Sequence, residues 1–427
     1  MDIPSLYELY LQSAGVTTDT RKIGKGQLFF ALKGESFNGN TFAQQALENG
    51  AAYAIIDEQQ YAINERTILV EDVLQTLQQL GLYHRRKINP KAVIAITGSN
   101  GKTTTKELVH AVLNTTYKTH YTKGNLNNHI GIPLTLLEMS AGTEIAVIEM
   151  GANHQHEIES YCLYTEPTHG IITNCGKAHL EGFGGMEGIR KGKGELYDYL
   201  KKNKGTVFVN GDDEILMSML SERKIDDPVT YGQQQTNRYH SNIISDHPFI
   251  NIQFENVQLH TNLYGNYNFS NMMCAVAVGK YFDVPNENIK QAIENYFPAN
   301  SRSQLVERNG YSIIMDAYNA NPTSMTHALE SFAKSNSAVK VVILGDMFEL
   351  GEYSEEEHQE IADLCKKLGF DIVVLVGERF AKTKTDKSIL KFLTVDDAKN
   401  WFSRQKFNQS EILLKGSRSM KMEKVVE

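Results

Sequence analysis

Hydrophobic residues in this chain gather in short continuous runs, separated by longer stretches in which apolar residues recur at helical spacing. Short runs rich in β-branched residues are typical of strands buried on both faces, and the stretches between them are typical of crossover helices. The alternation predicts an α/β fold with mainly parallel sheets. The predicted strands cover residues 27–32, 52–56, 92–96, 145–148, 170–173, 313–315, 341–344, 372–375 and 412–414.

Two changes in this pattern divide the chain. The polar, proline-containing segment 85–90 separates a small α/β unit from the apolar run that follows it. From about residue 303 the alternation starts again, which is typical of a Rossmann-like domain, although no GxGxxG follows its first strand. We therefore predict three domains: a small N-terminal α/β domain at 1–88, a central parallel-sheet domain at 89–302 and a C-terminal Rossmann-like domain at 303–427.

Composition and charge narrow the class of protein. The chain has 427 residues, more than one hydrophobic core usually supports, which agrees with several domains. Its net charge of −8 argues against a nucleic-acid-binding surface. The N-terminus lacks a basic segment followed by an apolar stretch, and no apolar run is long enough to span a bilayer. We expect a cytoplasmic protein without membrane insertion.

The cysteines point to the same compartment. Cys162, Cys175, Cys274 and Cys365 are far apart in the sequence and show neither metal-like nor redox-pair spacing. Scattered reduced thiols are typical of the cytoplasm.

The segment after the strand at 92–96 carries the strongest chemical signal. It reads Thr97-Gly98-Ser99-Asn100-Gly101-Lys102-Thr103-Thr104 and leads into a predicted helix from near Lys102 to about Leu113. Glycines let backbone N–H groups point at phosphates, the helix start adds positive potential, and the Thr103 hydroxyl can bind Mg²⁺. The strict GxxxxGK[ST] pattern fails because Ile96 stands at the first glycine position. The alternative is a glycine turn that binds nothing.

Three polar residues of the central domain are further candidates. Glu149 ends a predicted strand at the same sheet edge as the loop, where its carboxylate is a suitable oxygen ligand for Mg²⁺. His179 lies beyond the next predicted strand, where a surface or core histidine is the usual alternative. Lys193 lies on a helix predicted from about Met186 to Leu200, where composition alone indicates a solvated lysine.

These segments resemble the Mur ligase family, which also includes the folylpolyglutamate synthases. The resemblance rests on TGSNGKTTTKE, on IEMGA at 148–152, and on Asn174 with the string from His179 to Gly184. It implies that Thr103 and Glu149 bind one Mg²⁺ and that His179 and Lys193 bind a second. In this family the lysine matching Lys193 is often carbamylated by CO₂, a modification that the sequence leaves open.

Two further segments resemble the nucleotide-binding residues of the family. Gly265-Asn266-Tyr267-Asn268-Phe269-Ser270-Asn271 resembles Gly-x-His-Asn-x-x-Asn, and its asparagines share one helix face. Because Tyr267 replaces the histidine, only Asn268 and Asn271 are carried over, with helix capping by Asn268 as the alternative. Arg302 matches an arginine that reaches the ATP phosphates, although Ser303-Gln304 depart from the usual Met-Glu.

The C-terminal domain contains the most discriminating string, Asp316-Ala317-Tyr318-Asn319-Ala320-Asn321-Pro322. Asp316 can accept hydrogen bonds from ribose hydroxyls, and Tyr318 or Asn319 can contact adenine. A capped strand-to-helix turn is the alternative. Together with segments 344–351 and 414–418, this string resembles the family members that add D-alanyl-D-alanine. The Asp-Asn-Pro-Arg motif of the members that add diaminopimelate does not occur in this sequence.

The N-terminal domain extends the resemblance to nearly the whole chain. Thr18-Asp19-Thr20-Arg21, the run 29–34 with Lys33, and Asn38-Gly39-Asn40 resemble segments that bind the UDP part of the substrate. Asn38 and Asn40 replace a frequent aspartate and histidine. Folylpolyglutamate synthases lack this domain.

The resemblance implies an ATP-dependent amide ligase. The carboxylate of a UDP-N-acetylmuramoyl-tripeptide is activated as an acyl phosphate and then attacked by the amine of D-Ala-D-Ala. Lys102 would hold the phosphates, while Arg302 and Asp316 bring the third domain onto the nucleotide. We expect ATP, two Mg²⁺, these two small substrates and a monomer. The alternatives are another amide ligase of the same fold and an ATP-driven binding or regulatory protein without ligation chemistry.

Overall fold

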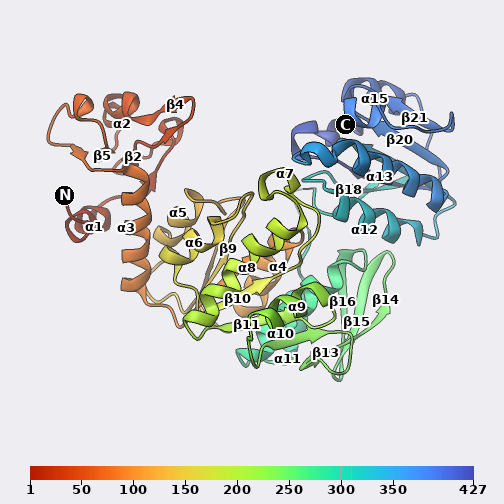
Figure 1. Cartoon of the computed structure of the whole chain (residues 1–427), viewed down its shortest axis with the longest axis horizontal. Helices are drawn as coiled ribbons and strands as arrows, with labels where there is room; N and C mark the ends of the chain where they lie inside the picture. The colour runs from red at the N-terminus through yellow and green to blue at the C-terminus, as the bar shows by residue number, and fades with distance from the viewer. Residues whose placement is uncertain (299–300, 309) are drawn as a thin grey trace.

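The computed structural model describes residues 1–298, 301–308 and 310–427, and it arranges the chain as three α/β units that follow one another in space (Figure 1). Each unit has its own main sheet with helices packed against it. The predicted α/β class and the three-domain organisation are therefore confirmed. The predicted boundaries at 88/89 and 302/303 fall between these sheets and stay predictions.

The N-terminal unit is built on a four-stranded parallel sheet with the order β1-β2-β5-β6. Alternate strand residues face opposite layers: Leu28 and Phe30 pack with α1 and α3, whereas Phe29 packs with α2. Burial on both faces explains the continuous apolar runs. The elements are α1 (Ile3–Gln12), β1 (Val16–Thr17), β2 (Leu28–Phe30), β3 (Lys33–Gly34), β4 (Phe37–Asn38), α2 (Ala43–Glu48), β5 (Tyr53–Ile56), β6 (Thr67–Leu69) and α3 (Val73–Ile88).

Helix α3 joins the N-terminal unit firmly to the central unit. Its buried His84 contacts the Tyr7 hydroxyl at 2.9 Å on one side and the Met139 carbonyl at 2.8 Å on the other. Leu137 of α5 belongs to the same apolar cluster as the residues of α1 and α3. The first two units thus share part of their core.

The central unit has a seven-stranded parallel sheet with the order β13-β12-β11-β10-β7-β9-β8. Val93 and Ala95 of β7 pack with α5, α6 and α8, whereas Ile94 and Ile96 pack with α4 and α10. The elements are β7 (Ala92–Thr97), α4 (Lys102–Leu113), β8 (Thr119–Tyr121), α5 (Gly131–Leu137), β9 (Ile145–Glu149), α6 (Glu157–Thr165), β10 (His169–Ile172), α7 (Leu180–Phe183), α8 (Met186–Lys202), β11 (Thr206–Asn210), α9 (Glu214–Glu222), β12 (Val229–Gly232), β13 (Tyr239–His240), α10 (Asn268–Tyr281) and α11 (Asn286–Glu294).

A three-stranded antiparallel sheet in the same unit was not among the predicted elements. It consists of β14 (Asn242–Ser245), β15 (Phe249–Phe254) and β16 (Val257–Tyr264). In β15 buried and half-buried residues alternate, because only one face of the strand is packed against the core. Such alternating strands contain no continuous apolar run.

The C-terminal unit has a six-stranded sheet with the order β17-β18-β22-β19-β20-β21, in which only the β17–β18 pair is antiparallel. Helices α12 and α13 pack on one face and α15 on the other, as expected for a Rossmann-like domain. The elements are β17 (Gln304–Arg308), β18 (Tyr311–Asp316), α12 (Pro322–Ala333), β19 (Val339–Gly345), α13 (Ser354–Leu368), β20 (Ile372–Val376), α14 (Glu378–Ala381), β21 (Ile389–Phe392), α15 (Val395–Phe402) and β22 (Ser410–Lys415). Across the three described stretches, no helix is long and apolar enough to cross a bilayer.

Two half-buried histidines of the central unit should make the stability of the fold depend on pH. Burial lowers the pKa of His110 and of His169 from 6.5 to about 4. The unfolded chain therefore binds more protons than the folded chain between these values. We expect the urea midpoint of unfolding to be highest above about pH 6.5 and to fall as the pH is lowered toward about 4.

The substitution His169→Gln removes one of these two histidines. The urea midpoint of the variant should therefore fall less steeply between pH 7 and pH 5 than that of the original protein. A midpoint of the original protein that stays constant over this range would contradict the prediction.

Candidate functional site

A polar cavity of about 650 Å³ lies between the central and C-terminal units. Its lining comes from the loops after β7, β9 and β10 and from the carboxyl ends of β18 and β22. Functional groups gather at this edge of parallel sheets because all strand ends point the same way. The predicted site residues in its lining are Ser99, Asn100, Gly101, Lys102, Thr103, Thr104, Glu149, His179, Asn268, Asn271, Arg302, Asp316, Tyr318 and Asn319.

The loop at 97–104, here called the phosphate loop, depends on two glycines with positive φ. Gly98 has φ of +143°, and a β-carbon at this position would lie 1.9 Å from Thr173 Oγ1. Gly101 has φ of +78°, and a β-carbon there would lie 2.4 Å from Asn271 Oδ1. Both the backbone conformation and the close neighbours therefore require glycine.

Lys102 lies at the start of α4 and folds back over the phosphate loop. Its Nζ donates hydrogen bonds to the carbonyls of Gly98 at 2.7 Å and Ser99 at 3.0 Å. Burial lowers the pKa of Lys102, an effect that the charge of Glu149 opposes. The ammonium is therefore held beside the loop, where a phosphate group would lie.

Asn100 is held in place by the segment after β10. Its N–H donates to Asn174 Oδ1 at 3.1 Å, and its carbonyl accepts from Thr173 Oγ1 at 2.6 Å and Asn174 Nδ2 at 3.0 Å. The turn of the phosphate loop is thus fixed by two residues of the neighbouring strand end.

Glu149 is buried beside the loop with two hydrogen-bond donors on one oxygen. Its Oε1 accepts from Thr103 Oγ1 at 3.1 Å and from Asn127 Nδ2 at 2.8 Å. Its Oε2 has no hydrogen-bond partner in the described structure and faces Lys106 Nζ at 3.5 Å. A carboxylate next to a threonine hydroxyl is a donor set that suits Mg²⁺, so the residues present fit the predicted first metal site.

Lys106 is a charged residue of this site that the sequence analysis missed. Its side chain is 0% exposed and lies on the face of α4 that meets Glu149. Removing one partner of a buried ion pair usually destabilises a protein by about 3–5 kcal/mol, because the other charge stays buried without compensation. The position of Lys106 four residues after Lys102, on the same helix face, was the available signal.

His179 and Lys193 occupy different surroundings. His179 lines the cavity, and its Nδ1 forms an ion pair with Glu349 of the C-terminal unit. Lys193 is 0% exposed, its Nζ has no hydrogen-bond partner among the described residues, and it lies 5.0 Å from the centre of the Phe183 ring. Burial, and then the charge of Lys102, lowers the pKa of Lys193 to about 7. The alternative of a solvated lysine is therefore wrong.

A metal at this second position would need ligands beyond the usual protein carboxylates and imidazoles. In residues 1–298, 301–308 and 310–427 no three His, Cys, Asp or Glu side chains are grouped so that they could hold an ion. A carbamylated Lys193 would add a carboxylate-like group, and phosphate oxygens would supply further ligands. The second metal site stays a prediction.

Asn268 and Asn271 share one face of α10, as predicted. Asn271 Nδ2 donates to Asn268 Oδ1 at 2.8 Å, and Asn271 Oδ1 accepts from Thr105 Oγ1 at 3.1 Å. Asn268 Nδ2 donates to the Tyr264 carbonyl, and the side chain makes no capping bond. The capping alternative is wrong, and the pair instead connects α10 to α4 behind the phosphate loop.

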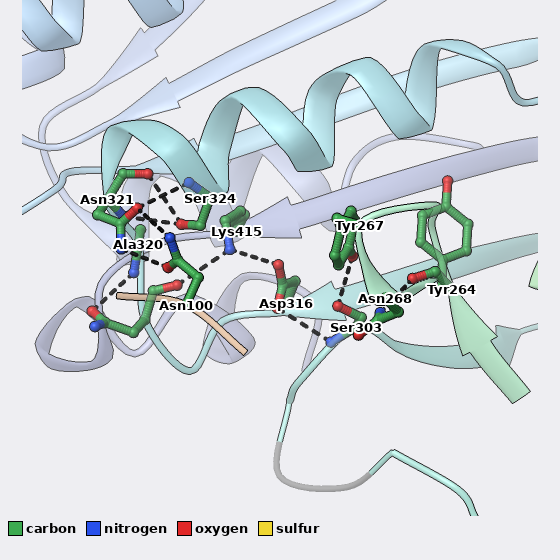
Figure 2. A network of polar contacts seen from close by, with 11 residues as sticks. Asn100, Tyr264, Tyr267, Asn268, Ser303, Asp316, Ala320, Asn321, Ser324 and Lys415 are labelled. Carbon is green, nitrogen blue, oxygen red and sulfur yellow. Dashed lines mark hydrogen bonds and ion pairs between the residues drawn. The ribbon is translucent and has the colours of Figure 1, made fainter. Parts of the chain in front are cut away.

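The C-terminal side of the cavity is built around Asp316. Figure 2 shows its carboxylate between Lys415 Nζ at 2.5 Å and the Ser303 N–H at 3.2 Å. Lys415 also donates to the Asn319 carbonyl at 3.2 Å. These contacts hold Asp316 at the rim of the cavity. Lys415 lies in segment 414–418, and the family resemblance of that segment alone did not predict a role for Lys415 in the site.

Arg302 and Tyr318 are stacked at the same rim. The Arg302 guanidinium lies 3.5 Å from the centre of the Tyr318 ring. Arg418 lies over the same ring at 5.2 Å. Cation–π contacts of this kind favour a fixed orientation of the guanidinium. The planar group thus faces the cavity from a defined position.

The predicted UDP-binding residues belong to the N-terminal unit and are not among the described residues that line the cavity. Asp19 accepts from the Arg21 N–H and forms an ion pair with its guanidinium at 2.9 Å, within the short turn that contains Thr18 and Thr20. Lys33 forms an ion pair with Asp57 at 3.0 Å. Their role in substrate binding stays a prediction.

Comparison with known proteins places this geometry in a family. Models of three Mur ligase domains match the chain in order: the family's catalytic domain at 12–85, the middle domain at 96–279 and the glutamate ligase domain at 301–417. The chain is 37% identical to UDP-N-acetylmuramoyl-tripeptide--D-alanyl-D-alanine ligase of Bacillus subtilis over 97% of its own length and 92% of the relative's. It belongs to the Mur ligase family.

Other members of the Mur ligase family agree in sequence and in fold. The protein of the same name from Escherichia coli is 35% identical, with 96% of this chain and 92% of the relative covered. The crystal structure of MurF from Acinetobacter baumannii matches with a TM-score of 0.88 at 30% identity, over 99% and 97% of the two chains. MurF ligase from Thermotoga maritima, solved in complex with ADP, matches with a TM-score of 0.86 at 26% identity, over 98% and 97%.

The packing of the phosphate loop generates a prediction for this Mur ligase. Gly98→Ala forces a β-carbon against Thr173 Oγ1, whereas Gly124→Ala meets no atom within 4 Å although Gly124 also has positive φ. Gly124, at φ +55°, lies in the left-handed helical region that other residues can adopt, whereas φ +143° at Gly98 is open essentially to glycine alone. The difference between the two variants therefore contains both the clash and the larger backbone strain at Gly98. We expect Gly98→Ala to lower the free energy of unfolding by about 1–3 kcal/mol more than Gly124→Ala, measured by urea denaturation.

Adding Thr173→Ala to Gly98→Ala removes the closest atom and should recover part of this loss. Equal stabilities of the Gly98→Ala and Gly124→Ala variants would show that the loop has room for a β-carbon.

Proposed function

We propose that this chain is an ATP-dependent ligase that joins D-alanyl-D-alanine to UDP-N-acetylmuramoyl-tripeptide. The proposal is supported by relatives of that name at up to 37% identity over nearly the full chain. Its strongest structural support is the cavity in which the phosphate loop faces Asp316 and Asn319 of the C-terminal unit. One wall offers groups for phosphates, and the opposite wall offers groups for a nucleoside. We place the reaction in the cytoplasm, where ATP is available.

In the first step, a carboxylate oxygen of the tripeptide attacks the γ-phosphorus of ATP, and the bond to ADP breaks. The phosphate loop and Lys102 hold the phosphates in line with the carboxylate, and Arg302 faces the developing negative charge. Positioning and charge stabilisation account for most catalysis of this kind. Thr103 and Glu149 would hold one Mg²⁺, and His179 and Lys193 a second, which when bound would neutralise phosphate charge.

In the second step, the amine of D-Ala-D-Ala attacks the acyl phosphate. A C–N bond forms through a tetrahedral intermediate, the C–O bond to phosphate breaks, and the amine loses a proton. Positive groups around the cavity stabilise the oxyanion and the leaving phosphate. The Asp316–Lys415 pair keeps the C-terminal wall of the cavity fixed during this exchange.

The decisive experiment is mass detection of the UDP-muramoyl-pentapeptide from tripeptide, D-Ala-D-Ala and MgATP. We expect product with D-Ala-D-Ala and none when L-lysine, D-glutamate or L-glutamate replaces it. The Lys102→Ala variant should lose product by at least about a hundredfold while keeping its circular dichroism spectrum, because one fixed charge at a transferring phosphate is worth several kcal/mol. Product from Lys102→Ala at the original rate, or ATP turnover that ignores every amine, would contradict the proposal.

We further propose that Lys193 is carbamylated. A buried amine without hydrogen-bond partners is available to attack CO₂, forming an N–C bond and releasing a proton. The resulting carbamate can bind a cation that an ammonium would repel.

Lys193→Ala should therefore lose most of its kcat, and added acetate should restore part of it by supplying a carboxylate. Lys191→Ala is the matched control, because Lys191 lies two residues away on the same helix with an exposed side chain. Steady-state rates with and without acetate test this. A Lys193→Ala variant that acetate does not improve, with no CO₂ adduct on Lys193 by mass spectrometry, would argue for an unmodified lysine.

A further inference from the structure

The start of α12 reaches from the C-terminal unit to the phosphate loop. Figure 2 shows the side chain of Asn321, which caps α12, facing the side chain of Asn100. Asn321 Nδ2 donates to Asn100 Oδ1 at 2.8 Å, and Asn100 Nδ2 lies 3.4 Å from Asn321 Oδ1. Asn321 is only 5% exposed. The two amides therefore meet in a part-buried contact between residues that are 221 positions apart in the sequence.

The oxygen and the NH₂ group of the Asn321 side chain make different hydrogen bonds. Its Oδ1 accepts from the Ser324 N–H at 2.9 Å, which is the capping bond. A helix cap requires only this oxygen, and serine, threonine or aspartate provide it equally well. The NH₂ group is not needed for capping, and it makes the shorter of the two contacts with Asn100. The choice of asparagine thus serves the contact with the loop.

A second contact fixes the same helix start. Thr323 Oγ1 accepts from the Lys177 N–H at 2.9 Å, and a β-carbon on Gly176 would lie 2.8 Å from this oxygen. Gly176 in turn exchanges two hydrogen bonds with the Ser99 hydroxyl, at 2.8 and 3.0 Å. The beginning of α12 therefore rests both on the phosphate loop and on the segment that supports it.

Two other polar contacts between these units are ion pairs. Lys177–Glu357 and His179–Glu349 each involve at least one partner that is more than a third exposed. Long or exposed charged side chains keep contact over a range of positions and contribute little specificity. The two short amide side chains, of which Asn321 is buried and Asn100 half-buried, have less freedom to keep their bond when the units shift.

We propose that Asn321 is a positioning residue for the phosphate loop, which fixes the side chain of Asn100 when the C-terminal unit is docked. Docking of that unit and the shape of the loop are thereby coupled. The inference rests on the proposed function only in that the loop serves phosphoryl transfer. Asn321 acts through Asn100 and does not itself hold the phosphates.

The test uses Asn321→Ser, which keeps a capping oxygen but cannot reach Asn100. One net hydrogen bond corresponds to about a fivefold change, so we expect kcat to fall about fivefold and KM for the UDP-tripeptide to stay unchanged. In the Asn100→Ala background, Asn321→Ser should cause no further loss, because the partner is already gone. Thr394→Ala, which removes the cap of α15 in the same unit, controls for a general effect of capping.

A second measurement does not depend on activity. Spin labels on Ser221→Cys and Lys387→Cys, both exposed, report the distance between the central and C-terminal units, and the four native cysteines are buried. In the ligand-free full chain, Asn321→Ser should shift part of the distribution to longer distances, whereas Thr394→Ala should not.

The results separate the inference from the proposed function. An original protein that makes no pentapeptide refutes the proposed function, whereas the distance distribution still tests the contact. The inference is overturned if Asn321→Ser keeps both the original kcat and the original distances, or if Thr394→Ala changes both to the same extent.

Discussion

The whole site depends on the absence of two β-carbons. At Gly98 and Gly101 the phosphate loop approaches Thr173 and Asn271 so closely that any side chain would push the loop away from its support. This close approach allows three parallel strands to bring their ends to one point. Asn100 can then be held by the neighbouring strand end, and α12 can rest on the loop from the other unit. The contacts of Asn100 with Asn174 and with Asn321 build on that fixed backbone.

Charge inside the central unit is arranged unevenly around the loop. Glu149 has an opposite charge, Lys106, on one side and neutral donors on the other, so one of its oxygens is directed toward the threonine hydroxyl. Among the described residues Lys193 has no such partner, and burial alone would favour its neutral form. One carboxylate of this region is therefore already oriented, whereas the Lys193 side chain, as an ammonium, would repel a nearby cation.

Much of this could be predicted from the sequence, and the reasons are physical. Strands buried on both faces appear as apolar runs, so β7, β9 and β18 were found, and residues directly after such strands were correctly expected at one edge. The antiparallel sheet β14–β16 was missed because buried and half-buried residues alternate along a strand such as β15, which leaves no continuous apolar run. The Lys106–Glu149 and Asn100–Asn321 contacts were missed because the partners are distant in sequence, and the spacing of Lys106 from Lys102 does not identify Glu149 as its partner.

Helix α3 makes the central unit depend on the N-terminal unit. Leu137 of α5 packs into the same cluster as Leu77 and Leu80 of α3. The central unit therefore has an apolar surface where it contacts the N-terminal unit. A chain shortened to its last two units would expose this surface to water, and the Met139 carbonyl would lose its imidazole partner. A chain of this fold without an N-terminal unit would need either a more polar α5 or another segment to cover this surface.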